Sequence, residues 1–181
     1  MEDELFLSRM VDMDRMRTVG FMTEFGSIPN DSVSIQSIER IMDNADGERL
    51  SWGYWSYKNF YLDETNQSEV RTTLYNINGT IQYNKVKALT RPFAQAVAGR
   101  SQYMNFDSVN AVFTLKFVPD LNIRQPTVIS INKLWYPNGV RITVEPEGSL
   151  LPIKHLSYPL LELFNNPRAN AETIAITIQP N

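Results

Sequence analysis

Glu24 and Trp55 are the two residues of this sequence whose types and spacing could do chemistry. Glu24 ends a short apolar run in GFMTEFG (residues 20–26), and Trp55 lies in a second apolar run at residues 50–57. Glycoside hydrolysis needs a carboxylate that attacks the anomeric carbon or activates water, and an indole beside it can stack on the sugar ring. Each residue also fits a structural role, Glu24 as a solvated strand end and Trp55 as a core side chain.

The elements that would position these residues alternate between helix and strand up to about residue 98. Apolar residues at helical spacing predict an amphipathic helix over 4–16 and a second helix that stops at Gly47. Both apolar runs predict buried strands, so the order strand, helix, strand favours a parallel sheet. The segment 83–99 is expected to be helical, with Pro92 as a break or a new start.

Side-chain alternation places Glu24 and Trp55 at matching positions of the two expected strands. Glu24 shares its face with Met22, while Trp55 shares its face with Gly53 and Tyr57. The carboxyl ends of parallel strands form one rim in a barrel, and barrel enzymes carry their reactive groups there. We therefore expect Glu24 and Trp55 to be neighbours. Two parallel strands leave open edges, so we expect further strands from outside this chain to complete the sheet.

After Gly99 the pattern changes to β-branched, partly alternating runs separated by turn residues. This pattern predicts a small antiparallel β-sandwich. The expected strands are residues 110–118, 127–132, 140–146 and 173–180.

Composition and charge exclude several other classes of function. A net charge of −3 and a pI near 5.2 give no electrostatic reason to expect nucleic acid or an anionic membrane as partner. The chain has no cysteine, and His155 is its single histidine, which excludes a thiolate site, a histidine-based triad and a multi-histidine metal site. Asp43, Asp46 and Glu48 are expected to form a solvated helix end, and no metal or cofactor is expected.

Targeting features leave the localisation of the chain open. Its first residues are acidic where a signal peptide would be basic, and no apolar run approaches the roughly 20 residues of a membrane span. Three N-glycosylation sequons begin at Asn30, Asn66 and Asn78. They matter only if the chain enters the secretory pathway.

Four motifs occur in a fixed order along nearly the whole chain. They are TEFG at 23–26, WGYWSYKNF at 52–60, RPFAQAVAG at 91–99 and YPNGVRITVEPEG at 136–148. Together they resemble the carboxyl-terminal part of the endoglycoceramidase-like branch of glycoside hydrolase family 5. The resemblance implies an α/β plus all-β fold. Residues 1–98 would be the last two βα units of a TIM (β/α)8 barrel, and residues 99–181 a small antiparallel β-sandwich.

The resemblance also assigns roles to individual residues. It implies that Glu24 is the nucleophile at the end of the seventh barrel strand, and that Trp55 is the aromatic residue that the eighth strand brings to the sugar. Tyr57 and Lys58 are further candidates for substrate binding, with rim packing and a plain loop role as their alternatives. The implied activity is that of a retaining β-glycosidase that hydrolyses glycosphingolipids such as glucosylceramide-like glycolipids.

The second carboxyl group that this reaction needs is not found in the sequence. The family's acid/base glutamate follows an asparagine in an NEP motif, and no NEP occurs here. Glu145 in VEP lacks the asparagine and comes after the expected nucleophile, so we expect it to be a surface residue at a strand end. The chain alone is therefore expected to be inactive, because nothing would protonate the leaving group.

The expected partner is a glycan or glycolipid, with peripheral contact to a membrane-borne substrate and no obligate protein partner. Full-length relatives are expected to be secreted, vesicular or lysosomal. The alternative function is a non-catalytic carbohydrate- or lipid-binding module. In that case binding would depend on exposed aromatic residues and would not need Glu24.

Overall fold

The protein forms two compact units, Met1–Leu89 and Thr90–Asn181. The computed structural model describes residues 2–58, 72–153 and 156–181. His155 and Asn66 lie outside these residues. The sequence pattern places a boundary after residue 98, whereas the compact units divide between Leu89 and Thr90.

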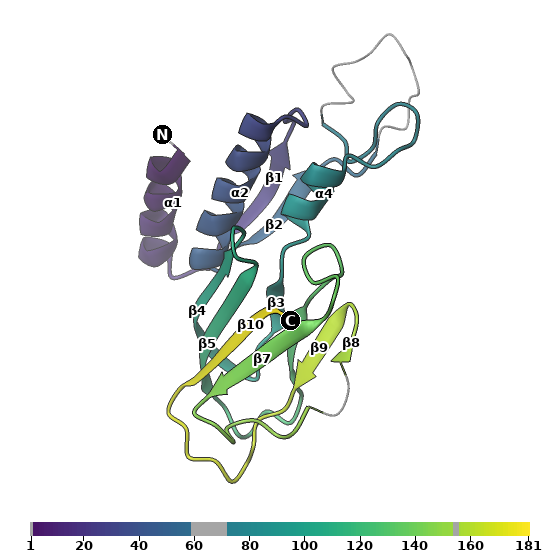
Figure 1. The fold of residues 1–181 in the computed structure, drawn as a ribbon. Coiled ribbons are helices and arrows are strands. Elements are labelled where there is room, and N and C mark those ends of the chain that lie inside the picture. Colours follow the sequence, from purple (N-terminus) through teal and green to yellow (C-terminus); the bar gives the residue numbers. More distant parts are fainter. Residues whose placement is uncertain (1, 59–71, 154–155) are drawn as a thin grey trace. The chain divides into compact units, whose positions relative to one another are not determined.

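The first unit contains a two-stranded parallel sheet whose strands are joined through a helix (Figure 1). Strand β1 pairs in parallel with β2, and α2 lies between them in sequence. This confirms the expected order of strand, helix and strand and the helix expected over 4–16. The elements are α1 (Glu2–Met16), β1 (Phe21–Gly26), α2 (Ser32–Gly47), β2 (Ser51–Trp55) and α4 (Tyr83–Leu89).

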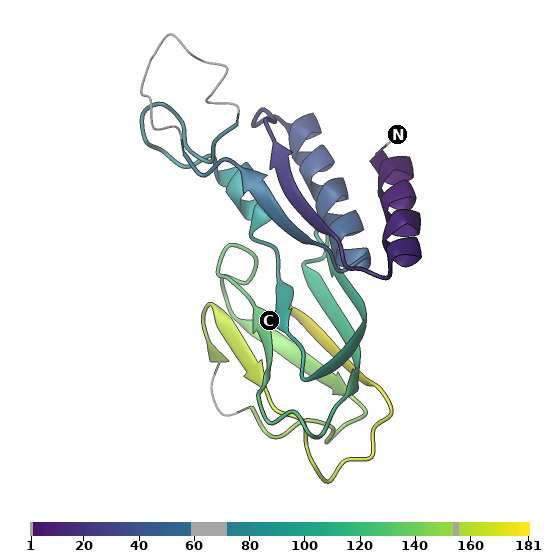
Figure 2. The same cartoon turned by 180° about the vertical axis from the view of Figure 1, so that it is seen from behind.

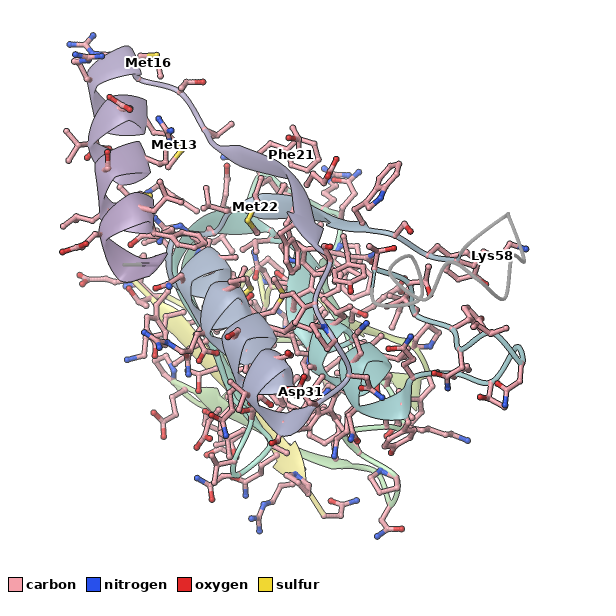
Figure 3. The ribbon with its side chains drawn as sticks, turned by 90° about the horizontal axis from the view of Figure 1, so that it is seen from above. Met13, Met16, Phe21, Met22, Asp31 and Lys58 are labelled. Atoms are coloured by element: carbon pink, nitrogen blue, oxygen red, sulfur yellow. The ribbon has the colours of Figure 1, made fainter. Side chains whose placement is uncertain are left out.

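Helix α2 covers one face of this sheet. Its N-cap is Asp31, at the start of the helix (Figure 3). The Asp31 carboxylate accepts hydrogen bonds from the Ser34 backbone N at 2.9 Å and the Ser34 hydroxyl at 3.0 Å. Ile38, Met42 and Ala45 are buried at helical spacing and pack with α4 and with the half-buried residues of both strands. The core of the first unit therefore lies between α2, α4 and one face of the sheet.

Asp46 departs from the expectation of a solvated helix end. Its side chain is only 5% exposed, while Asp43 and Glu48 are exposed. Asp46 follows Met42 by four residues, so the helical repeat places it on the buried face of α2. The expectation is wrong for this residue, because its spacing from Met42 outweighs its charge.

The helix expected over 83–99 ends early. Helix α4 stops at Leu89, and Phe93–Ala96 form strand β3 of the second unit. Pro92 disfavours helical geometry in the residue before it and has no amide proton for a helix interior, which separates the two elements. The pairing of β3 with β6 then overrides the helical preference of its alanines.

The second unit consists of two four-stranded antiparallel sheets (Figures 1 and 2). Their orders are β4-β5-β10-β7 and β3-β6-β9-β8. The expected strand runs are observed as β5, β6, β7 and β10, whereas β3, β4, β8 and β9 were not expected. The further bounds are β4 (Gly99–Asp107), β5 (Val112–Pro119), β6 (Thr127–Ser130), β7 (Val140–Glu145), β8 (Leu156–Ser157), β9 (Leu160–Leu163) and β10 (Ile174–Pro180).

The two sheets of the second unit share one hydrophobic core. Alternate residues of β5 and β10 are buried from one sheet, and residues of β6 and β9 are buried from the other. Burial of each such side chain stabilises the fold by roughly 1.5–3 kcal/mol. The core members from these strands are Phe113, Leu115, Phe117, Ile129, Leu161, Leu163, Ile174, Ile176 and Ile178.

Lys85 is a buried cation in the first unit. It lies on α4, its side chain is fully buried, and its Nζ donates a hydrogen bond to the carbonyl oxygen of Thr73 at 3.1 Å. Burial lowers the pKa of Lys85 to about 8, because loss of solvent disfavours the charged ammonium.

Replacement of Lys85 by methionine tests this burial. Between pH 8 and the ordinary pKa of 10.5, the unfolded chain keeps a proton that the folded chain has lost. The unfolded state then binds more protons, so wild-type stability rises with pH in this window. From about pH 8 to about pH 10, the unfolding free energy of the wild type should rise by about 1–2 kcal/mol relative to Lys85→Met. Denaturant titrations of both proteins measure this difference, and a flat or falling difference would contradict a desolvated lysine.

Candidate active site

The carboxyl ends of β1 and β2 approach each other closely. Gly26 is the register partner of Trp55, and its φ of +142° lies in a region that side chains rarely adopt. A Cβ on Gly26 would overlap the carbonyl oxygen of Trp55. Glycine at this position therefore lets the two strands remain paired to their ends. Glu24 and Trp55 consequently lie at the same end of the sheet.

A bulge in β1 changes which residues share a face with Glu24. Met22 pairs with Trp52 and Phe25 with Tyr54, so β1 has one residue more than β2 between these pairs. Met22 and Phe25 both pack against the core of the first unit, while Glu24 and its neighbour Thr23 are both exposed. The expectation that Glu24 shares a face with Met22 is wrong, because strict alternation fails at a bulge.

Strand β2 follows the expected alternation. Trp52 and Tyr54 pack against the helices, and Trp55 is 58% exposed. A Cβ added to Gly53 would lie 3.1 Å from the backbone oxygen of Thr23, so the small residue accommodates the bulged strand. Phe25 and Tyr54 pack on the α2 side of the sheet, whereas Glu24 and Trp55 are exposed, so these two side chains leave the sheet on the face opposite α2.

Tyr57 and Lys58 follow β2 directly. Tyr57 is 61% exposed, and its ring meets the ring of Tyr75 edge to face with 5.4 Å between centroids. The two hydroxyl oxygens are 3.2 Å apart, and this hydrogen bond is the main cause of a raised pKa at Tyr75. Lys58 is exposed and ends the described segment (Figure 3). Asn59 lies outside the described residues.

The backbone after β2 is held by a second segment of the first unit. The amide N of Ser56 donates to the carbonyl oxygen of Thr72 at 2.8 Å, and the amide N of Leu74 donates to that of Tyr57 at 3.1 Å. These hydrogen bonds hold the backbone around Tyr75 next to the backbone around Tyr57, so the two rings are in contact. Tyr75 could not be found from the sequence, because a single tyrosine in a polar loop carries no periodic pattern that would place it beside the expected site.

Aromatic packing supports the strand ends from the core side. The ring of Phe25 meets the rings of Trp52 and Tyr54 edge to face, at centroid distances of 5.6 and 5.3 Å. Burial raises the pKa of Tyr54 to about 12, and its buried hydroxyl makes no hydrogen bond among the residues that the structure describes. Three aromatic rings therefore pack together on the core face, behind the exposed face.

The exposed face can do limited chemistry with the residues present. At the strand ends it offers the carboxylate of Glu24 and the indole of Trp55, and the exposed ring of Tyr57 follows two residues after β2. Within residues 2–58, 72–153 and 156–181, no three acidic or histidine residues are grouped so that they could hold a metal ion. Glu145 is exposed at the end of β7, as expected, and belongs to the second unit. An exposed carboxylate at the same end of the sheet as an exposed indole fits attack on a sugar that stacks on that indole.

Comparison with known proteins identifies the second unit. Residues 91–178 match the glycoside hydrolase family 5 C-terminal domain. The chain carries a family 5 C-terminal domain. The match begins at Arg91, the second residue of the second unit.

Two curated relatives are similar to most of the chain, including residues of both units. The chain is 28% identical over 147 residues to an endoglycoceramidase of Cyanea nozakii, covering 80% of the chain and 29% of the relative. It is 30% identical over 162 residues to an endoglycoceramidase of Hydra vulgaris, covering 88% of the chain and 30% of the relative. The chain therefore spans less than a third of the length of these relatives, and its resemblance to the carboxyl-terminal portion of an endoglycoceramidase-like family 5 protein is confirmed.

Solved structures show the same fold. Endo-glycoceramidase II from Rhodococcus sp., seen as a lactosyl-enzyme intermediate, aligns with a TM-score of 0.70 and 21% identity over 91% of this chain and 34% of that chain. Sterylglucosidase 1 from Cryptococcus neoformans aligns with a TM-score of 0.68 and 18% identity over 89% of this chain and 29% of that chain. No helix in the described part of the chain is long and apolar enough to cross a membrane.

Substitution of Gly26 by alanine tests the geometry of the strand ends. The added Cβ would collide with the carbonyl oxygen of Trp55, and alanine rarely adopts the φ of this position. Gly26→Ala should therefore lower the unfolding free energy by about 1–3 kcal/mol or more. Gly47→Ala is the matched control, because nothing lies within 4 Å of its added Cβ. That change should be neutral or stabilise by up to about 1 kcal/mol. Equal effects of both substitutions in chemical denaturation would contradict the close approach.

Proposed function

We propose that Glu24 is the nucleophile of a retaining β-glycosidase and that Trp55 is its sugar-binding platform. The substrate class is a glycolipid in which a β-linked sugar head group is joined to a lipid aglycone. The observation that carries the proposal is the pairing of Gly26 with Trp55, which sets an exposed carboxylate and an exposed indole at one end of two parallel strands. The curated relatives named endoglycoceramidase support the same reaction class.

We also propose that residues 1–98 correspond to the last two βα units of a TIM barrel and residues 99–181 to a β-sandwich. The parallel pair β1 and β2 with its connecting helix supports the barrel interpretation. Two antiparallel sheets with a shared core support the sandwich interpretation. In a barrel, the ends of β1 and β2 would belong to the catalytic rim.

The proposed reaction proceeds in two displacement steps. A Glu24 carboxylate oxygen attacks the anomeric carbon, the bond to the aglycone oxygen breaks, and that oxygen takes a proton from a carboxylic acid. Water then displaces Glu24 from the glycosyl-enzyme with the same group acting as base, which restores the original configuration. Trp55 and Tyr57 would hold the sugar by stacking, and Lys58 could donate hydrogen bonds to its hydroxyls.

The reaction needs a second carboxyl group about 5–5.5 Å from the first. The sequence contains no NEP motif, and Glu145 lies on a strand of the other unit. We therefore propose that the chain by itself does not hydrolyse glycosides. The remaining catalytic groups would come from a barrel portion outside this chain, and the curated relatives extend well beyond the matched region, which is 29–30% of their length.

A chimera tests the role of Glu24. This chain would replace the matching carboxyl-terminal part of the Hydra vulgaris endoglycoceramidase. Glu24→Gln should lower kcat on a glycosphingolipid by at least about 1,000-fold, because the amide cannot form the glycosyl-enzyme. Glu48→Gln, which removes an exposed carboxylate of the same unit, should leave kcat unchanged. In Glu24→Ala, azide should restore turnover of an activated aryl β-glycoside and give the α-glycosyl azide.

The chain by itself, outside the chimera, tests whether turnover needs an acid/base carboxyl group that it lacks. It should show no turnover of a fluorogenic β-glucoside or of a glycosphingolipid. Turnover that Glu24→Gln abolishes would contradict the proposed inactivity and leave the role of Glu24 intact. Full activity of the Glu24→Gln chimera would contradict the role itself.

A further inference from the structure

A short exposed turn precedes α4 in the first unit. Tyr75 and Ile81 form an antiparallel bridge, and the amide N of Asn76 donates to the carbonyl oxygen of Thr80 at 2.8 Å. The amide N of Gly79 closes the turn onto the carbonyl oxygen of Asn76 at 2.9 Å. Residues 76–80 are all exposed, and they contain the sequon Asn78-Gly79-Thr80.

The two sequon side chains are bonded to each other in this turn. The Thr80 hydroxyl donates to Asn78 Oδ1 at 2.6 Å, and the Thr80 amide N donates to the same oxygen at 3.1 Å. Asn76 Nδ2 donates to Thr80 Oγ1 at 2.9 Å. These bonds fix the Asn78 carboxamide through its oxygen. Its Nδ2 makes no hydrogen bond to any residue that the structure describes.

The surroundings of Asn78 leave room for a large substituent. Gly79 adopts a φ of +78°, and no heavy atom lies within 4 Å of the position that a Cβ would occupy there. Oligosaccharide transfer acts on nascent chains, so the folded structure must accommodate a glycan that is already attached. An exposed asparagine at a turn meets this requirement, because the glycan extends into solvent without displacing core side chains.

We propose that Asn78 is an N-glycosylation site that is modified when the chain is made in the secretory pathway. Nδ2 attacks C1 of the first sugar of a lipid-pyrophosphate-linked oligosaccharide. The bond from C1 to the pyrophosphate oxygen breaks, the lipid pyrophosphate leaves with the electron pair, and Nδ2 loses one proton to a base of the transferase. The step involves no oxidation or reduction, and the co-substrate is this activated glycolipid.

The other described sequon is a poorer acceptor. In Asn30-Asp31-Ser32 the middle residue is the N-cap of α2, and its carboxylate is bonded to the backbone and hydroxyl of Ser34. Ser32 is the first residue of that helix. The negative charge of Asp31 therefore adjoins the acceptor amide in the nascent chain as well as in the folded structure. The sequon at Asn66 lies outside the described residues and is included in the test.

The test is site-resolved glycan mapping of the full chain. The chain would be produced behind a cleavable secretory signal in cultured animal cells, and peptides from whole-cell lysate would be analysed by mass spectrometry with and without peptide N-glycosidase. The expected result is a glycan on the peptide that contains Asn78. Asn78→Asp and Thr80→Ala should lose it, whereas Thr80→Ser should retain it. Asn30→Asp and Asn66→Asp should leave occupancy of Asn78 unchanged.

Two features of this design keep its outcome interpretable. Asn78→Asp keeps the Oδ1 atom that accepts both Thr80 hydrogen bonds, so it removes the acceptor nitrogen with little change to the turn. Analysis of lysate rather than secreted protein records transfer even when a variant fails to fold. An unmodified Asn78 in the secretory wild-type chain would overturn the proposal. A mobility shift that persists undiminished in Asn78→Asp would overturn it as well.

Discussion

The approach of the Gly26 backbone to the carbonyl oxygen of Trp55 is the constraint on which the arrangement of the candidate site depends. A side chain at Gly26 would separate the strand ends, and the parallel register would be lost where the exposed residues lie. Phe25 and Tyr54, one residue earlier on each strand, pack edge to face on the core side. Aromatic packing behind the sheet and a glycine at its end thus act together to hold Glu24 and Trp55 on the opposite face.

The bulge in β1 explains why part of this arrangement could not be predicted from sequence. Apolar spacing and the capping residue Asp31 are enough to predict α2, and the strand-like runs on either side predict a parallel pair. Strict alternation assigned Met22 to the face of Glu24, because a pattern of period two cannot show an inserted residue. The three-residue spacing of Met22 and Phe25, both on the core face, was the available sign of the bulge. The roles of Glu24 and Trp55 came from the family resemblance, since each residue alone fits an ordinary strand end.

The motif RPFAQAVAG carries the family resemblance, but its secondary structure differs from the helix that the sequence predicts. Its alanines favour a helix, yet residues 93–96 form a strand because tertiary pairing decides the outcome. Contacts within the second unit explain why the motif ends in alanine and glycine. The amide N of Ala98 donates to the buried Thr127 hydroxyl at 3.0 Å, and its carbonyl oxygen accepts from Asn165 Nδ2 at 2.8 Å. A Cβ on Gly99 would overlap the backbone oxygen of Val118, so glycine is required where β4 begins.

The assignment of Glu24 as nucleophile is tested most directly by trapping the covalent intermediate. An activated 2-deoxy-2-fluoro β-glycoside forms the glycosyl-enzyme of a retaining enzyme but is released slowly, because fluorine destabilises the oxocarbenium-like transition state. The chimera with the Hydra vulgaris endoglycoceramidase would be labelled, digested with trypsin and sequenced by tandem mass spectrometry. We expect one fluoroglycosyl adduct, located on Glu24 within the peptide Thr18–Arg40. An adduct on another carboxylate of an active chimera, with Glu24 unlabelled, would contradict it.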